Sequence, residues 1–177
     1  VMEMEGAILT NNKELAEDLN SIRLHGRGQD KYEHVRIGMN SRLDTIQAAI
    51  LIEKLKIFAK EIKERNILAK YYNEHLNNSY IKPIIDDKLF ISTWAQYTLQ
   101  SDNRDQVIKE LNKAKIPSAI YYPLSLKSQE AFKHYPMVSS GLKNSELLSK
   151  RVFSIPMHAY MLDEDKERIV HTLNNLS

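Results

Sequence analysis

Residues 24–42 hold the densest group of side chains that could bind an anion. The stretch is polar, interrupted by glycines and without helical or strand periodicity, and loops longer than ~12–15 residues inside a compact domain are commonly functional or disordered. Arginine guanidinium groups bind carboxylates and phosphates through paired hydrogen bonds, and an asparagine amide can donate to a phosphate oxygen. The candidate residues are His25, Arg27, Tyr32, His34, Arg36, Asn40 and Arg42.

Two interpretations of this stretch stay open on the residue types alone. It can be an anion-binding loop, as its arginines suggest. It can equally be a solvated loop whose last residues cap the next helix, with Asn40 or Ser41 accepting hydrogen bonds from the backbone N–H groups of the first turn.

The second candidate group is the tyrosine pair Tyr121 and Tyr122, at the end of a predicted strand and directly before Pro123. Paired tyrosines can line a pocket and form hydrogen bonds with a sugar or a phosphate. Tyrosines at strand ends more commonly pack against the core. His158, alone after a short strand, is a weaker candidate, because a lone histidine in that place is usually structural.

Composition excludes several other chemistries. The chain has no cysteine, and none of its 6 histidines has metal-ligand spacing. Its 5 glycines form no phosphate-binding loop motif. A net charge of +2, from 25 basic and 23 acidic residues, argues against nucleic acid as a partner. No apolar run would span a bilayer and no signal peptide is visible, so we expect a cytoplasmic protein without a membrane partner.

The elements that must position the candidates begin with a short buried strand over residues 6–10. A helix follows, with Asn12 as its N-cap and apolar residues at Leu15, Leu19 and Ile22. Apolar residues at four- and three-residue steps then predict one long helix over residues 43–76, which would be about 50 Å long. Such a helix can connect two domains or line a dimer contact, or be a plain surface helix.

The rest of the chain predicts alternating strands and helices. Strands are expected over 91–99, 118–122 and 153–156. Helices are expected over 103–113, 145–151 and 163–176, with Asn103 and Asp163 as caps. The alternation predicts an α/β or α+β sandwich, and for the chain as a whole we expect the α/β class. We therefore expect three parts: residues 1–42 as the edge of a larger domain that carries the loop, residues 43–76 as a connecting helix, and residues 77–177 as a small C-terminal α+β domain.

Residues 38–49, GMNSRLDTIQAA, carry a recognisable pattern. They resemble the signature G-x-N-x-R-x-[DN]-x-[IL]-Q-A-A of the DegT/DnrJ-type sugar-nucleotide aminotransferases, which depend on pyridoxal 5'-phosphate (PLP). Further segments match in the same order: GAILTN at 6–11, RLHG at 23–26, YPLSLKSQ at 122–129 and SIPMH at 154–158. The chain departs from the family pattern at Ser125, Lys127 and Ala159.

The resemblance implies the C-terminal part of a fold-type-I aminotransferase. Such an enzyme is a homodimer, holds PLP on a lysine as a Schiff base and takes its amino group from glutamate. The chain is most similar to transaminases that aminate UDP-2-acetamido-3-oxo-glucuronate, a UDP-sugar of lipopolysaccharide O-antigen biosynthesis. By the same resemblance, Asn40 would reach the neighbouring subunit's PLP phosphate, Arg42 would bind an anionic group of the substrate, and Tyr121 and Tyr122 would line the sugar pocket.

The same resemblance places the Schiff-base lysine just before Val1. Lys13 and Lys31 are expected in a helix and a loop, so they are no substitutes for it. We therefore assign no catalytic group to the chain, and expect that it neither binds PLP nor transaminates by itself. The alternative is a non-catalytic assembly module that complements a separately encoded N-terminal half.

Overall fold

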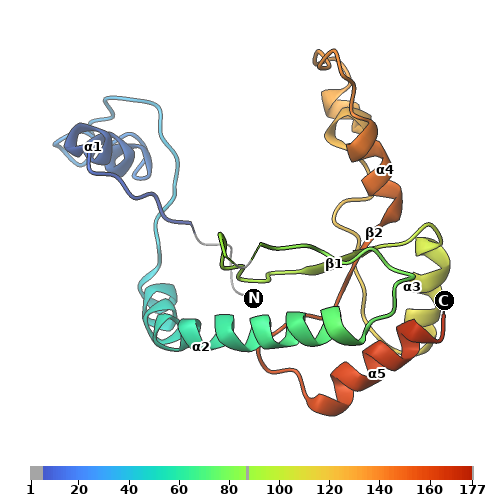
Figure 1. Ribbon diagram of the computed structural model, residues 1–177. Coiled ribbons are helices and arrows are strands. Elements are labelled where there is room, and N and C mark those ends of the chain that lie inside the picture. The colour runs from blue at the N-terminus through green and yellow to red at the C-terminus, as the bar shows by residue number, and fades with distance from the viewer. Residues whose placement is uncertain (1–5, 87, 177) are drawn as a thin grey trace. The chain divides into compact units, whose positions relative to one another are not determined.

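A computed structural model describes residues 6–86 and 88–176 (Figure 1). The chain divides into two compact units, Val1–Ile57 and Phe58–Ser177. The boundary falls inside the longest helix, α2 (Thr45–His75). This helix confirms the prediction of one long helix over residues 43–76. The proposed three-part domain organisation stays a prediction.

The first unit consists of α1 (Lys13–Ile22), a long loop and the beginning of α2. Asn12 caps α1 as predicted, since its Oδ1 accepts a hydrogen bond from the Leu15 backbone N–H at 3.1 Å. The predicted buried strand at 6–10 is wrong, because these residues are exposed and form no strand. A strand needs a neighbouring strand for its hydrogen bonds, and the described residues offer none to this segment.

The second unit is built around a two-stranded antiparallel sheet. Strand β1 (Tyr97–Gln100) pairs with β2 (Val152–Ile155), and Tyr97 lies opposite Ile155. Single bridges extend the sheet on both sides, from Ile81 to Gln100 and from Ala119 to Ser154. The helices of this unit are α3 (Arg104–Lys113), α4 (Lys143–Arg151) and α5 (Asp163–Asn174), with short 3-10 helices at Leu126–Ser128 and Glu130–Phe132.

Three buried tyrosines hold this core together. The Tyr72 hydroxyl donates to the Pro156 carbonyl at 2.9 Å, and the Tyr80 hydroxyl donates to the Leu173 carbonyl at 2.9 Å. The Tyr97 hydroxyl donates to Asn73 Oδ1 at 2.6 Å. Because each hydroxyl has an acceptor, the rings can be buried without the cost of an unpaired polar group. Burial raises the pKa of all three hydroxyls.

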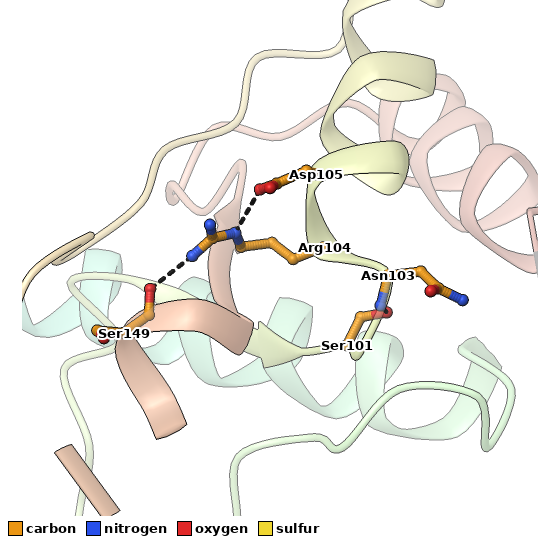
Figure 2. A network of polar contacts seen from close by, with 5 residues as sticks. All are labelled: Ser101, Asn103, Arg104, Asp105 and Ser149. Atoms are coloured by element: carbon orange, nitrogen blue, oxygen red, sulfur yellow. Dashed lines mark hydrogen bonds and ion pairs between the residues drawn. The ribbon is translucent and has the colours of Figure 1, made fainter. Parts of the chain in front are cut away.

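An arginine connects α3 to α4. Arg104, at the start of α3, donates from Nε to Asp105 at 2.8 Å and from Nη1 to the Ser149 carbonyl in α4 (Figure 2). Its side chain is only 12% exposed, whereas that of Asp105 is 83% exposed. The bond to Ser149 therefore fixes the backbone of α4 near its C-terminal end.

Two predicted strands are wrong in extent, and one of the two predicted caps of the second unit is misplaced. Residues 91–96 form no strand, and Trp94 has a φ of 46°, which an extended chain does not allow. Residues 118–122 form only the bridge at Ala119, next to prolines that lack a backbone donor. Asn103 occupies the N-cap position of α3 as predicted, but its side chain makes no cap bond. Asp163 is the first residue of α5 rather than its cap, and its carboxylate pairs with Lys166 at 2.6 Å.

Candidate functional site

The loop after α1 folds back onto the end of that helix. The His25 N–H donates to the Met39 carbonyl at 3.0 Å, and the Met39 N–H donates to the Ile22 carbonyl at 2.8 Å. The Ser41 N–H donates to the Arg23 carbonyl at 3.0 Å. These backbone bonds give the two ends of the loop a defined register, which a freely solvated loop would lack.

Two glycines make this close approach possible. A Cβ added to Gly38 would lie 2.1 Å from the Gly26 backbone nitrogen, and a Cβ added to Gly26 would lie 1.7 Å from the Arg36 carbonyl oxygen. Gly26 also has a positive φ of 74°. Both positions therefore require glycine, and together they hold residues 38–42 against the end of α1.

Part of the predicted anion-binding cluster is engaged in holding the loop. Arg36 forms an ion pair with Asp18 of α1 at 2.7 Å. His34 Nδ1 lies 3.0 Å from the His25 carbonyl oxygen. The side chains of Arg27 and Tyr32 are exposed. The contacts thus give Arg36 and His34 a structural role in this loop.

Asn40 and Arg42 form a polar pair at the end of the loop. Arg42 Nε donates to Asn40 Oδ1 at 2.9 Å, and both side chains are exposed. Within residues 6–86 and 88–176, Asn40 Nδ2 makes no hydrogen bond. Since Oδ1 is already occupied, the pair presents an amide NH₂ and a guanidinium outward, which is a donor set that fits a phosphate or a carboxylate.

The capping interpretation of these residues is wrong. Helix α2 begins at Thr45, so neither Asn40 nor Ser41 lies directly before its first residue. Asp44 does, and its carbonyl accepts the first helical bond, from the Ala48 N–H at 2.9 Å. The side chains of Asn40 and Ser41 therefore do not occupy the N-cap position of α2.

The second candidate group lies in the other unit. Tyr121 and Tyr122 are 45% and 73% exposed, so they are not part of the core. Their ring centroids are 5.9 Å apart and the rings are nearly perpendicular, at 80°. Both rings line an open hollow of about 600 Å³. The other lining residues are Pro123, Leu124, Ser125, Leu126, Lys127, Gln129, Leu142, Ser145, Leu148, Ser149 and Val152.

A smaller hollow of about 350 Å³ adjoins this one and was not anticipated from the sequence. It is lined by apolar and aromatic residues that include Phe132, Tyr135 and Met137. These residues lie in a stretch without helical or strand periodicity. One feature of the sequence could have predicted this hollow, namely the concentration of large apolar residues in an irregular segment. Such residues are normally buried in a core or form a binding surface.

His158 has a structural role, in line with the expectation for a lone histidine. Its Nδ1 accepts a hydrogen bond from the Tyr160 backbone N–H at 3.2 Å. The Tyr160 hydroxyl in turn donates to Glu61 Oε1 of α2 at 2.6 Å, and this bond raises the pKa of Tyr160. Among the described residues, no group of three or more histidine, aspartate and glutamate side chains could hold a metal ion.

Solved structures with the same architecture show to which class of protein this fold belongs. The chain matches the crystal structure of a DegT DnrJ EryC1 StrS aminotransferase from Brucella abortus with 44% identity and a TM-score of 0.90, over 94% of this chain and 44% of that one. It matches S. venezuelae DesV, solved in complex with a ketimine intermediate, with 26% identity and a TM-score of 0.85, over 95% of this chain and 45% of that one. The fold is thus that of the mixed α/β, fold-type-I sugar aminotransferases.

The model of the DegT/DnrJ/EryC1/StrS aminotransferase family matches residues 4–174, and the chain belongs to this family. Among curated relatives, it is 40% identical to the UDP-2-acetamido-2-deoxy-3-oxo-D-glucuronate aminotransferase of Pseudomonas aeruginosa, over 88% of this chain and 42% of that protein. It is 36% identical to the dTDP-3-amino-3,6-dideoxy-alpha-D-galactopyranose transaminase of Aneurinibacillus thermoaerophilus, over 96% of this chain and 46% of that protein. The chain therefore spans less than half the length of these relatives.

Proposed function

We propose that the chain is the C-terminal part of a PLP-dependent aminotransferase that aminates a nucleotide-linked keto sugar. The observation that carries this proposal is the 40% identity, over 88% of the chain, to a relative named for a UDP-linked oxo-glucuronate. We further propose glutamate as the amino donor, a homodimer as the working form, and lipopolysaccharide O-antigen sugars as the pathway.

Asn40 and Arg42 are proposed to meet the anionic groups of cofactor and substrate. When bound, PLP supplies an electron sink for amino transfer. The free Nδ2 of Asn40 is suited to donate to its phosphate, across the dimer. Arg42, held through Nε by Asn40 Oδ1 at 2.9 Å, keeps its two Nη groups for a paired interaction with a carboxylate such as that of a glucuronate.

Tyr121 and Tyr122 are proposed to contact the sugar. Their exposed rings line the larger hollow, where each can offer a hydroxyl as donor or acceptor. The hydroxyls of Ser145 and Ser149 line the same hollow. These hydroxyls, set among apolar lining residues, could form hydrogen bonds with the hydroxyl groups of a sugar.

Transamination is proposed to need a Schiff-base lysine supplied from outside these 177 residues. One observation supports this: the chain spans 42% of its P. aeruginosa relative. The family resemblance adds the expectation that the Schiff-base lysine lies just before Val1. The alternative, a non-catalytic module that complements a separately encoded N-terminal half, uses the same surface groups. In the first proposal the part that carries the lysine belongs to the same polypeptide as this chain. In the alternative it is a separate polypeptide.

The test compares the chain alone with the chain expressed together with the coding segment upstream of it. Alone, the chain mixed with PLP should give no imine absorbance at about 410–430 nm. A single lysine adduct that survives borohydride reduction of the isolated chain would contradict the proposal. With the upstream part, amino transfer from glutamate to a UDP-linked keto sugar should appear. A pull-down of that part as a separate polypeptide would favour the assembly module.

A further inference from the structure

A third hollow, of about 500 Å³, lies beside the second half of α2 and shares no lining residue with the other two. We call it the α2 hollow. Helix α2 forms one wall with residues at helical spacing along one face, and the irregular segment 90–94 forms the other. The lining residues are Lys63, Asn66, Ile67, Lys70, Asn73, Phe90, Ile91 and Trp94.

Asn66 holds the two walls together. Its Nδ2 donates to the Ser92 carbonyl at 2.9 Å and to the Ile62 carbonyl of α2 at 2.8 Å. Its Oδ1 accepts a hydrogen bond from Trp94 Nε1 at 3.1 Å. Because one amide binds both the backbone and a side chain of the facing segment, the hollow is formed before any ligand arrives, which lowers the cost of binding.

The polar groups left over in the α2 hollow are donors. Lys63 and Lys70 are the only charged residues that line it in the described part of the chain. Lys63 has no hydrogen bond or ion pair with the described residues, and Lys70 has only an exposed pair with Glu74 at 3.8 Å, which is weak. Asn73 Oδ1 accepts from the Tyr97 hydroxyl, so its Nδ2 remains. A ligand here should therefore bring acceptors and negative charge.

The apolar side of the α2 hollow extends past its rim. Phe90 and Ile91 are 65% and 84% exposed, so a molecule confined to the hollow would leave their outer parts in water. The seven-residue step from Lys63 to Lys70 is about 10 Å along the helix. An extended polypeptide covers that distance in about three residues. A peptide with carboxylates on both sides of a large apolar side chain therefore fits the charges and the apolar rim together.

We propose that the α2 hollow binds an acidic, extended segment of a partner polypeptide. A phenylalanine or large aliphatic side chain enters the hollow beside Trp94, and acidic side chains on either side of it pair with Lys63 and Lys70. Asn73 Nδ2 donates to a carbonyl of the bound segment. This binding function is separate from the proposed amino transfer and does not depend on it.

The test uses Trp94, which is the only tryptophan of the chain and lines the hollow, so its fluorescence reports on occupancy. The 177-residue chain is titrated with the end-blocked peptides EEFEE, QQFQQ and EEGEE. EEFEE should change the fluorescence, and the other two should bind about tenfold or more weakly. Raising NaCl from about 0.05 M to about 0.5 M should weaken EEFEE and have little effect on QQFQQ.

Charge variants test the two lysines. K63Q/K70Q should weaken EEFEE about tenfold or more and leave QQFQQ unchanged. The matched control is K109Q/K143Q, which removes two exposed lysines of α3 and α4 and changes the net charge equally. This control should keep the affinity for EEFEE. Equal binding of EEFEE and QQFQQ, or unaltered binding of EEFEE by K63Q/K70Q, would overturn the proposed ion pairs.

An apolar variant tests the rim. I91S should weaken EEFEE and QQFQQ alike, whereas I84S, at an exposed isoleucine that does not line the hollow, should weaken neither. If EEFEE leaves the Trp94 fluorescence unchanged, the site is wrong. Phenylacetate tests the other class of ligand. If this small aromatic carboxylate binds as tightly as EEFEE, the hollow takes small molecules and the proposed polypeptide partner is wrong.

Discussion

At the residue scale, the pair Gly26 and Gly38 decides whether residues 38–42 keep their place. G38A would put a Cβ 2.1 Å from the Gly26 nitrogen, so the loop must open, at a cost of about 2 kcal/mol or more. We expect the amides of His25 and Met39 to lose hydrogen-exchange protection, because their bonds cross this contact. The control is G6A, since no atom lies within 4 Å of a Cβ placed there. Unchanged protection in G38A would contradict the packing.

Buried tyrosines give a second prediction at this scale. Burial raises the pKa of the Tyr72 and Tyr97 hydroxyls above the ordinary value of 10.0. The unfolded chain would release these protons near pH 10 while the folded chain keeps them, so the contribution of these two tyrosines to the free energy of unfolding should be constant below about pH 10 and fall above it. Urea unfolding between pH 7 and 11 measures this. Y72F and Y97F should each reduce the alkaline loss, and an unaltered slope in both would refute the assignment.

Site residues differ in how far the sequence could predict them. Asn40, Arg42, Tyr121 and Tyr122 were selected by residue type and motif, and the structure places all four with exposed polar groups. The pairing of Arg36 with Asp18 could not be predicted, because it depends on how the loop returns to α1. The position of Lys127 between the larger and the smaller hollow likewise depends on contacts with backbone carbonyls, which no spacing rule contains.

At the element scale, Arg104 carries the connection between α3 and α4. R104M would remove its bond to the Ser149 carbonyl and leave that acceptor without its charged donor, which should cost about 2 kcal/mol of unfolding free energy. D105N removes a partner that is 83% exposed and should change stability by less than about 0.5 kcal/mol. Urea denaturation of both variants checks this. Equal losses in the two would show that the surface pair, and not the bond to α4, stabilises the contact.

Helices were more predictable than strands for a physical reason. A helix satisfies its hydrogen bonds within one segment, so the cap at Asn12 and the apolar period through α2 were sufficient to locate both helices. A strand is defined by its partner. Residues 6–10 and 91–96 have strand-like composition but no partner strand among the described residues, whereas Tyr97–Gln100 has β2. Composition alone does not contain that information.

At the scale of the whole molecule, exposed apolar side chains predict association. The part of α2 in the first unit exposes Ile46, Ile50 and Leu55, and water-exposed apolar surface of this kind drives chains together. We expect oligomers by light scattering. I46K/L55K should shift the distribution toward smaller species, whereas I84K, at an exposed position in the second unit, should not. A monodisperse monomer of the unaltered chain would contradict the prediction.

The close approach of Gly26 and Gly38 also limits how this loop can vary by mutation. At both positions the nearest obstacles to a side chain are backbone atoms: the carbonyl of Arg36 for Gly26, and the nitrogen of Gly26 and the carbonyl of Ile22 for Gly38. A bulky neighbour can be exchanged for a smaller one, but a backbone atom cannot, so no second substitution can compensate for the loss of either glycine. In a saturation library selected for function, tolerated diversity should therefore concentrate at exposed positions such as Gln29 and Lys31, with glycine alone at 26 and 38.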